Sequence, residues 1–292
     1  MKYLMKLFIC LFILLGSYST VSAQLNKKKG PDIYIGFSGG INFTQAKPLN
    51  QFGILNSLTE TENDFFTKDY KPLLFNLGNQ FNFMFWYPVK EVLHLGISPG
   101  MATYNYTYVT TTSWNDEANN DVTRLTNTHH QKLRYLEIPI TVRYLIRFHS
   151  MSPYLQVGGS YGRLYAAQKQ SSGDLVLETT SGEFPINTQS NSGDVQDAYI
   201  GTKLTLFGGV GVAMDLKYVV LTLDANYHHG LNNVVNESNR YSDNTFSGAT
   251  YDVQDDIKLK HVVINLGLLF PINQIKKRGA LDCIYFNDRR PK

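Results

Sequence analysis

The stretch 135–166 restricts the possible folds more than any other part of this chain. Every second residue from Leu136 to Ile146 is apolar or aromatic, and charged or polar residues, including Glu137 and Arg143, stand between them. The segment PYLQVGGSYGRLYA repeats the alternation after the short link HSMS. A period of two is that of a β-strand with one face in an apolar medium and the other in a polar medium. Two such strands in succession predict a membrane β-barrel with lipid outside and a polar, packed interior.

The same alternation recurs along the chain and predicts an all-β fold, an eight-stranded antiparallel transmembrane barrel. The expected strands are 32–44, 72–87, a third that starts near 92 and continues through YNYTYVTTT, 135–148, 153–166, 198–214, 218–230 and 257–270. The ring must close because a bilayer offers no water to unpaired backbone groups. Each strand exceeds the roughly 9–11 residues that cross a bilayer, so we expect several to project beyond the lipid as a raised rim.

The links between the strands alternate in length. Long polar segments, which we expect to be loops, occupy 45–70, 109–132, 168–197 and 231–256, and short links occupy 88–91, 149–152 and 215–217. The long segments hold 17 acidic and 6 basic residues, so solvation or divalent cations at the lipopolysaccharide surface are their expected contacts. Outer-membrane barrels have short periplasmic turns and longer extracellular loops, which predicts four extracellular loops and both termini in the periplasm.

The chain begins with the features of a secretory signal peptide. It has a basic start, an apolar run from Leu7 to Leu15, and small residues at Val21-Ser22-Ala23 before the expected cleavage site. The apolar run is too short to span a bilayer as a helix. The expected organisation is a signal peptide (1–23), a periplasmic linker (24–31), an outer-membrane β-barrel (32–271) and a basic periplasmic tail (272–292). Only Cys283 would remain after cleavage, so no intramolecular disulfide is expected.

Six ionisable residues are expected to face the barrel interior. They are His94, Glu137, Arg143, Lys203, Asp224 and His228. With about eight strands the interior is just wide enough for side chains, so a wide passive pore is not expected. Inward-facing glycines would leave room for bulky inward side chains or for water. The simplest interpretation is a luminal network of ion pairs and hydrogen bonds, and a gated proton or ion path is the alternative.

We expect no catalytic, cofactor or metal site. The pairs His129-His130 and His228-His229 would each point to opposite faces of a strand, so neither pair chelates a metal by itself. Ser160 and His228 both face inward, but nothing places them near each other, and no H-E-x-x-H motif is present. The formal net charge of +3 gives no reason to expect a nucleic-acid partner.

The tail combines cations with apolar side chains. Its candidate docking residues are Arg278, Leu281, Ile284, Tyr285, Phe286, Arg289 and Arg290. Cations that flank apolar anchors suit a protein interface or the inner leaflet of the membrane. The tail is therefore either a disordered end or a short periplasmic element that docks on a partner, and Cys283 within it is a candidate redox or attachment thiol.

The hairpin formed by 135–166 resembles the PorT-like family of outer-membrane β-barrels of Bacteroidota. The resemblance rests on YLEIP at 135–139 and on the pattern P-Y-L-x-x-G-x-x-x-G at 153–162, with further likeness at 35–43 and 262–270. It implies a non-enzymatic accessory component of type IX protein secretion. The alternative is a small transport or surface-binding barrel of the OmpA/OmpX type. Expected partners are outer-membrane lipid, lipopolysaccharide and secretion-machinery proteins that contact the tail.

Overall fold

The computed structural model describes residues 33–53, 66–116, 121–148, 151–179, 182–216, 218–240 and 252–272. Its strands are β1 (Tyr34–Asn50), β2 (Phe66–Tyr70), β3 (Leu77–Pro88), β4 (Leu93–Ile97), β5 (Gly100–Asp116), β6 (Asp121–Leu145), β7 (Met151–Thr179), β8 (Gly182–Asp194), β9 (Thr202–Asp215), β10 (Val220–Gly230) and β11 (Asp256–Pro271). Short 3-10 helices occupy η2 (Leu73–Phe75), η3 (Gln196–Ala198) and η4 (Glu237–Asn239). Within these ranges no helix has the length and apolar character needed to cross a membrane.

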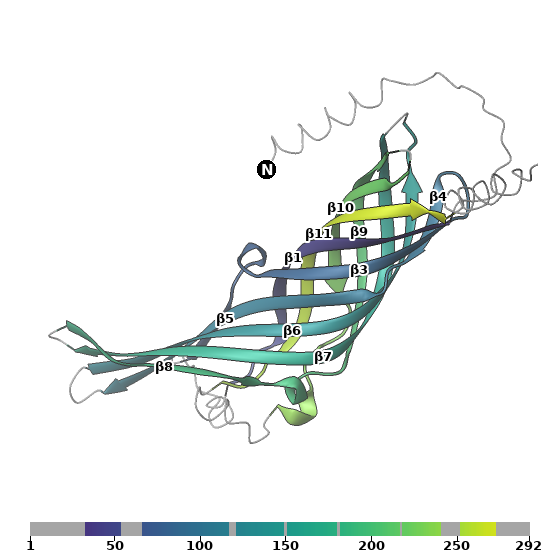
Figure 1. Ribbon diagram of the computed structural model, residues 1–292. Coiled ribbons are helices and arrows are strands. Elements are labelled where there is room, and N and C mark those ends of the chain that lie inside the picture. Colours follow the sequence, from purple (N-terminus) through teal and green to yellow (C-terminus); the bar gives the residue numbers. More distant parts are fainter. Residues whose placement is uncertain are drawn as a thin grey trace, which may run out of the picture. The chain divides into compact units, whose positions relative to one another are not determined.

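Antiparallel pairing closes the strands into a ring (Figure 1). β1 pairs with β11 on one side and with β3 on the other, and the ring continues through β6, β7, β9 and β10. β4 and β5 both lie between β3 and β6, so they form one strand that is interrupted at Ser98-Pro99. Counted this way, the ring has eight strands, which confirms the predicted antiparallel barrel.

Side chains alternate between the outer surface and the interior, as the sequence predicts. On β6 the side chains of Leu136, Ile138 and Ile140 are 45–56% exposed, whereas Glu137 and Arg143 are only 4–5% exposed. We call the outward apolar surface the apolar belt. Its residues are Ile35, Phe37, Ile41, Phe81, Phe83, Phe85, Leu95, Ile97, Met101, Leu136, Ile138, Ile140, Val142, Leu155, Val157, Tyr161, Leu204, Leu206, Val210, Leu223, Tyr227, Ile264 and Leu266. This belt is the surface that contacts lipid.

Three strands continue far beyond the apolar belt, so two of the expected loops were wrong. Residues 109–132 form paired strand, because β5 and β6 stay in register up to Asp116 opposite Asp121. Within 168–197, β7 continues to Thr179 and pairs with β8. Outside the lipid both faces of a strand can be polar, so the hydropathy alternation disappears while the backbone pairing remains. The rim predicted from strand length is thus a five-stranded sheet, β2-β5-β6-β7-β8 (Figure 1).

The other two expected loops are partly ordered. β1 extends to Asn50, and the segments around Gly53 and Asp252 form an isolated antiparallel bridge. These segments lie over the extracellular end of the ring, which we call the mouth. The predicted signal peptide, the linker and the tail from residue 273 onward lie outside the described residues.

Candidate functional site

The periplasmic half of the lumen is filled by a network around Arg143. Its guanidinium lies between the rings of Trp86 and Tyr154, with its central carbon 3.9 Å from each ring centre. It donates hydrogen bonds of 3.1 and 3.2 Å to the side-chain oxygen of Gln156. Gln156 in turn donates to the amide oxygen of Asn226 at 2.7 Å. The buried cation is therefore satisfied by aromatic faces and neutral amides.

Asp224 closes the same network from the other side. Its carboxylate accepts hydrogen bonds from Asn226 (2.5 Å), Asn265 (3.1 Å) and the Tyr154 hydroxyl (3.2 Å). Gln80 donates to the oxygen of Asn265 at 2.8 Å, so the network reaches β3. The structure thus links the predicted luminal residues Arg143 and Asp224, but through amides and a phenol rather than as an ion pair.

The predicted luminal residues Lys203 and Glu137 form an ion pair at the extracellular end of the apolar belt. The Lys203 ammonium lies 2.6 Å from a Glu137 oxygen, and their side chains are 1% and 6% exposed. Tyr104 donates to the other carboxylate oxygen at 2.9 Å, and its ring lies 3.5 Å from the ammonium. The His261 ring packs 4.6 Å from that of Tyr104 and 4.4 Å from that of His228. We call these five residues the luminal ion-pair cluster.

Glycines on the intervening strand make these contacts possible. In each case two side chains from strands i−1 and i+1 meet across a glycine of strand i. The triplets are Glu137–Gly162–Lys203, Tyr154–Gly211–Asp224, Gln156–Gly209–Asn226 and Gln80–Gly40–Asn265. A methyl group at Gly162 would lie 3.2 Å from the Glu137 carboxylate, and one at Gly209 would collide with the Asn226 amide oxygen. The inward glycines therefore hold space for larger side chains, as the sequence suggested.

The remaining predicted residue, His94, lies directly opposite Arg143 in the β4–β6 register. His94 stacks on Tyr34, with ring centres 6.2 Å apart, toward the periplasmic end of β4. Ser160 faces inward and is 4% exposed, but no hydrogen bond joins it to His228 among the described residues. Five of the six predicted luminal residues thus belong to the Arg143 network or to the luminal ion-pair cluster, and His94 lies beside the Arg143 network.

A third cluster fills the mouth, and sequence reasoning missed it. The mouth cluster consists of Lys68, Tyr70, Tyr108, His129, Lys169, Asp252 and Asp255. The Lys68 ammonium lies 2.8 Å from Asp252 and 2.9 Å from Asp255, and Lys169 lies 2.6 Å from the other Asp252 oxygen. Both carboxylate side chains are 0% exposed. The four charged residues come from segments expected to be solvated loops, and only the pairing of β2 with β5 and of β7 with β6 brings them together.

The electrostatics of the mouth follow from burial and close ammonium groups. Burial alone would raise the pKa of Asp252, but Lys169 and Lys68 hold that pKa well below its ordinary value. Burial raises the pKa of Tyr108, and the neighbouring Asp252 raises it further. Burial also lowers the pKa of His129 to about 3, although Asp252 opposes this shift. Asp252 is therefore ionised in the closed mouth, while His129 is neutral.

His129 raises the question of a hydrolytic site, because its Nδ1 atom lies 2.7 Å from the Ser171 hydroxyl. Its Nε2 atom lies 3.0 Å from the Thr110 hydroxyl, so a second hydroxyl stands where a catalytic triad would place a carboxylate. Ser171 is 2% exposed and His129 is 0% exposed, so a substrate cannot reach the pair. The arrangement joins β5, β6 and β7 by hydrogen bonds.

The adjacent histidines point to opposite faces, as expected. His129 is fully buried, whereas His130 is exposed on the outer face, where its Nδ1 atom lies 3.0 Å from the Thr107 hydroxyl. His228 and His229 divide in the same way. In the part of the chain that the structure describes, no group of three or more His, Cys, Asp or Glu side chains could hold a metal ion.

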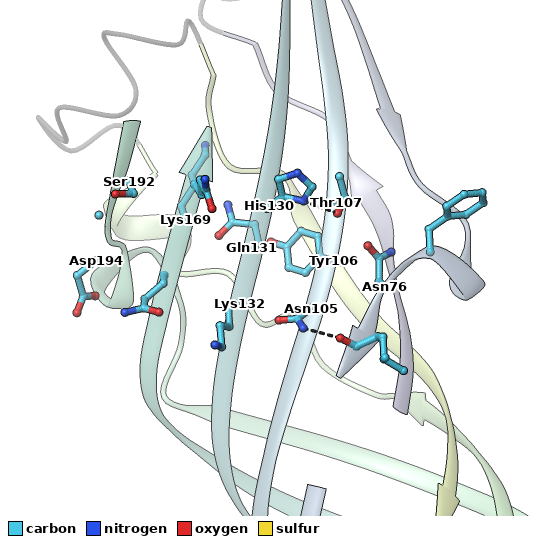
Figure 2. Close-up of a pocket in the computed structure, with 15 residues that line it drawn as sticks. Asn76, Asn105, Tyr106, Thr107, His130, Gln131, Lys132, Lys169, Ser192 and Asp194 are labelled. Atoms are coloured by element: carbon cyan, nitrogen blue, oxygen red, sulfur yellow. Dashed lines mark hydrogen bonds between the residues drawn. The ribbon is translucent and has the colours of Figure 1, made fainter. Parts of the chain in front are cut away.

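The outer face of the extended sheet carries a groove of about 790 Å³ directly above the apolar belt. Side chains from β5, β6 and β7 form its floor, which comprises Asn105, Thr107, His130, Lys132, Gln168 and Gln170. β8 and the segment 75–77 form its two margins (Figure 2). Asn105 donates a hydrogen bond of 2.6 Å to the Leu77 carbonyl oxygen and so fixes the η2 side of the groove. We call this concavity the outer-face groove.

Comparison with known proteins identifies a family and several similar solved structures. The sequence matches the family described as the outer membrane protein beta-barrel domain over residues 20–236. No curated protein sequence gives a significant match. Similar solved structures include Ail, the attachment invasion locus protein of Yersinia pestis, at 12% identity and a TM-score of 0.26, covering 82% of this chain and 99% of Ail. Neisserial surface protein A is 12% identical with a TM-score of 0.33, covering 83% of this chain and 99% of its own.

The outer membrane protease OmpT of Escherichia coli is 11% identical with a TM-score of 0.37, covering 86% of this chain and 99% of OmpT. The family match extends over most of the chain, and the closed ring with its apolar belt is the structure that such a family requires. The protein therefore resides in the outer membrane of a Gram-negative bacterium. The chain belongs to the outer membrane protein beta-barrel domain family.

Proposed function

We propose that this barrel is a non-enzymatic outer-membrane protein that acts through contacts made outside the membrane rather than by conducting solutes. The filled lumen carries the proposal. Tyr154 is 1% exposed in the periplasmic half, Lys203 is 0% exposed at the ion-pair cluster, and Asp252 is 2% exposed at the mouth. Inward side chains of an open channel would contact water, so these values favour a plugged barrel.

Reconstitution into planar bilayers tests the absence of conduction. We expect no conductance steps above the background of the same membrane without protein, at neutral pH and moderate salt. A wide porin, purified and inserted in the same way, provides the positive control. Reproducible ohmic steps from the folded, heat-modifiable protein would contradict the proposal, because they would require the three clusters to leave the lumen.

The specific role that we propose is that of an accessory component of type IX protein secretion. It is supported by the resemblance of the hairpin 135–166 to PorT-like barrels. Membership of the outer membrane protein beta-barrel domain family is compatible with this role. Deletion of the gene should abolish export of type IX cargo while other outer-membrane proteins remain at normal levels. Removal of residues 276–292 should also abolish export but leave heat-modifiable folding intact, because the predicted docking residues lie in this tail. Export that persists without the gene would contradict the role.

The five-stranded sheet above the membrane favours a second candidate, a surface-binding barrel of the OmpA/OmpX type. Among the described residues, β2 and β8 each pair with a strand on one side only, and strand edges offer unpaired backbone groups to a partner. Replacing the tips of the β5–β6 and β7–β8 hairpins by short turns should abolish surface binding in this case, with export unchanged. Under the secretion role the tail deletion has the larger effect, so the two variants separate the candidates.

A further inference from the structure

We propose that the outer-face groove binds a phosphorylated glycolipid of the outer leaflet. Lys132, Arg134 and Arg163, on the membrane-proximal side of the groove, would hold the phosphate. The amides of the groove floor would contact the sugar, and the apolar belt would receive the acyl chains. The proposal concerns the outer surface of the barrel and is independent of the role in secretion or surface binding.

The cations form a stripe that begins where the apolar belt ends. On β6 the outward residue beyond Leu136 is Arg134, and the next is Lys132 in the groove. On β7 the outward residue beyond Tyr161 is Arg163, which lies opposite Leu136 in the β6–β7 register. Lipid phosphates lie at the boundary between acyl chains and water, which is the level of these three side chains.

The three cations are available to an anion. None of the ion pairs formed by the described residues involves Lys132, Arg134 or Arg163. The periplasmic end of the barrel differs, because Arg147 there is 3.0 Å from the Glu91 carboxylate. Asp194, on the β8 margin of the groove, accepts a hydrogen bond of 2.8 Å from the Gln196 backbone N–H.

The floor of the groove suits hydroxyl groups. Gln168 and Gln170 are exposed on β7, and each amide offers a donor and an acceptor. Asn105 and Lys132 are register partners on β5 and β6, and Figure 2 shows them side by side in the groove. Because the Asn105 amide nitrogen is engaged with Leu77, its oxygen remains to accept from a ligand hydroxyl.

Apolar surface on both sides of the cation stripe distinguishes a lipid from a soluble sugar phosphate. Leu74, Phe75 and Leu77 are 76%, 75% and 55% exposed, and they stand beside a floor that is otherwise polar. Met101, 54% exposed on neighbouring β5, belongs to the apolar belt. A ligand that spans the apolar belt, the phosphate stripe and the amide floor must carry acyl chains as well as a phosphorylated sugar, and these are the parts of an outer-leaflet glycolipid.

The test uses the full-length folded protein in non-ionic detergent micelles doped with fluorescent lipid A at a low mole fraction. The triple variant Lys132→Ala, Arg134→Ala, Arg163→Ala should weaken binding by about 100-fold, since each cation near an anionic headgroup contributes roughly fivefold. The matched control is Lys47→Ala, Lys258→Ala, Lys260→Ala, which removes the same charge from the extracellular end of β1 and β11, on the opposite side of the ring. This control should bind within about threefold of the unchanged protein.

Two further arms complete the test. The charge-preserving variant Lys132→Arg, Arg134→Lys, Arg163→Lys should retain binding. The alanine triple should keep the heat-modifiable mobility of the unchanged protein, which excludes misfolding as the cause of the loss. Dephosphorylated lipid A should bind the unchanged protein as weakly as lipid A binds the triple alanine variant. Equal losses in the two alanine triples would overturn the proposal in favour of general surface charge. Displacement of lipid A by a soluble sugar phosphate at similar concentration would overturn the assignment to a lipid.

Discussion

The interior at the level of the lipid and the mouth outside it are both polar and both buried, but they are assembled differently. In the lipid-level interior, side chains from neighbouring strands meet across glycines, as Lys203 and Glu137 do over Gly162. In the mouth, Asp252 and Asp255 come from an irregular segment that lies against Lys68 on β2 and Lys169 on β7. The first arrangement joins the strands of the ring to one another, and the second fastens a loop segment to the ring.

This difference has an energetic consequence. A defect in the luminal ion-pair cluster weakens contacts between strands that must all remain paired in the bilayer, so it should affect unfolding of the whole ring. A defect in the mouth cluster should release residues 252–255 and β2, while the ring stays closed. The predictions below test this separation between global and local stability.

The largest effect is expected from Lys203→Met. It leaves the Glu137 carboxylate buried without its cation, and loss of one partner of a buried ion pair costs about 3–5 kcal/mol. Urea unfolding of the refolded protein in micelles, followed by tryptophan fluorescence and by heat-modifiable mobility, measures the loss. The double variant Lys203→Met, Glu137→Leu removes both charges and should regain most of it. A single variant as stable as the unchanged protein would show that the pair does not join the strands.

Asp252→Asn should act on the mouth alone. It removes the charge shared by Lys68 and Lys169, at an expected cost of about 2–3 kcal/mol for charge-assisted hydrogen bonds. Hydrogen exchange of β2 and of residues 252–255 should accelerate, with the urea midpoint of the ring unchanged. Asp69→Asn, on an exposed position of the same β2, is the matched control and should alter neither. A lower urea midpoint for Asp252→Asn would erase the distinction between mouth and ring.

Adjacent glycines on β9 test the role of space between strands. Gly209→Ala places a methyl group against the Asn226 side chain and the Ala225 backbone, and such overpacking costs about 1–3 kcal/mol. Gly208→Ala faces outward, where the nearest atoms are 3.9 Å away, and should be neutral or slightly stabilising. Urea unfolding of the two variants makes the comparison. Equal stabilities would show that the Gln156–Asn226 contact does not need a glycine beneath it.

Acid should loosen the mouth before the ring. The pKa of His129 is about 3 in the closed mouth against an ordinary value of 6.5, so between these values the opened mouth binds a proton that the closed mouth does not. The closed form is therefore most stable above pH 6.5 and loses stability as the pH falls toward 3. The depressed pKa of Asp252 preserves its own contribution until stronger acid. Hydrogen exchange of residues 252–255, corrected for intrinsic rates, should increase at about pH 4.5, and less so in His129→Gln.

The smallest effect is expected from Arg147→Ala at the periplasmic end. Arg147 pairs with Glu91 at 3.0 Å, but the two side chains are 55% and 85% exposed. Exposed pairs of this kind contribute less than about 1 kcal/mol. The urea midpoint should therefore match that of the unchanged protein within error, in contrast to Lys203→Met. A loss comparable to that of Lys203→Met would mean that burial does not decide which ion pairs stabilise this barrel.

The lipid-level strands could be predicted because the bilayer imposes an alternation on them. The inward orientation of Glu137, Arg143 and Lys203 followed from the same period of two. The contact partners of these residues could not be predicted from that period, because a contact such as that of Lys203 with Glu137 depends on the register of three strands. Inward glycines were a partial signal, since each marks a place where side chains from the flanking strands can meet.

The amino-acid sequence was sufficient to predict that apolar and polar residues alternate along eight segments, and hence that a closed barrel lies in the outer membrane. The three-dimensional fold was needed to show that 109–132 and 168–197 continue as strands, and that Lys68, Lys169 and Asp252 meet in a sealed mouth. This is because the outward side chains of a strand in the bilayer must be apolar, so every second residue there is apolar. Beyond the lipid, strands are held by backbone pairing and buried charges, which leave no such period in the sequence.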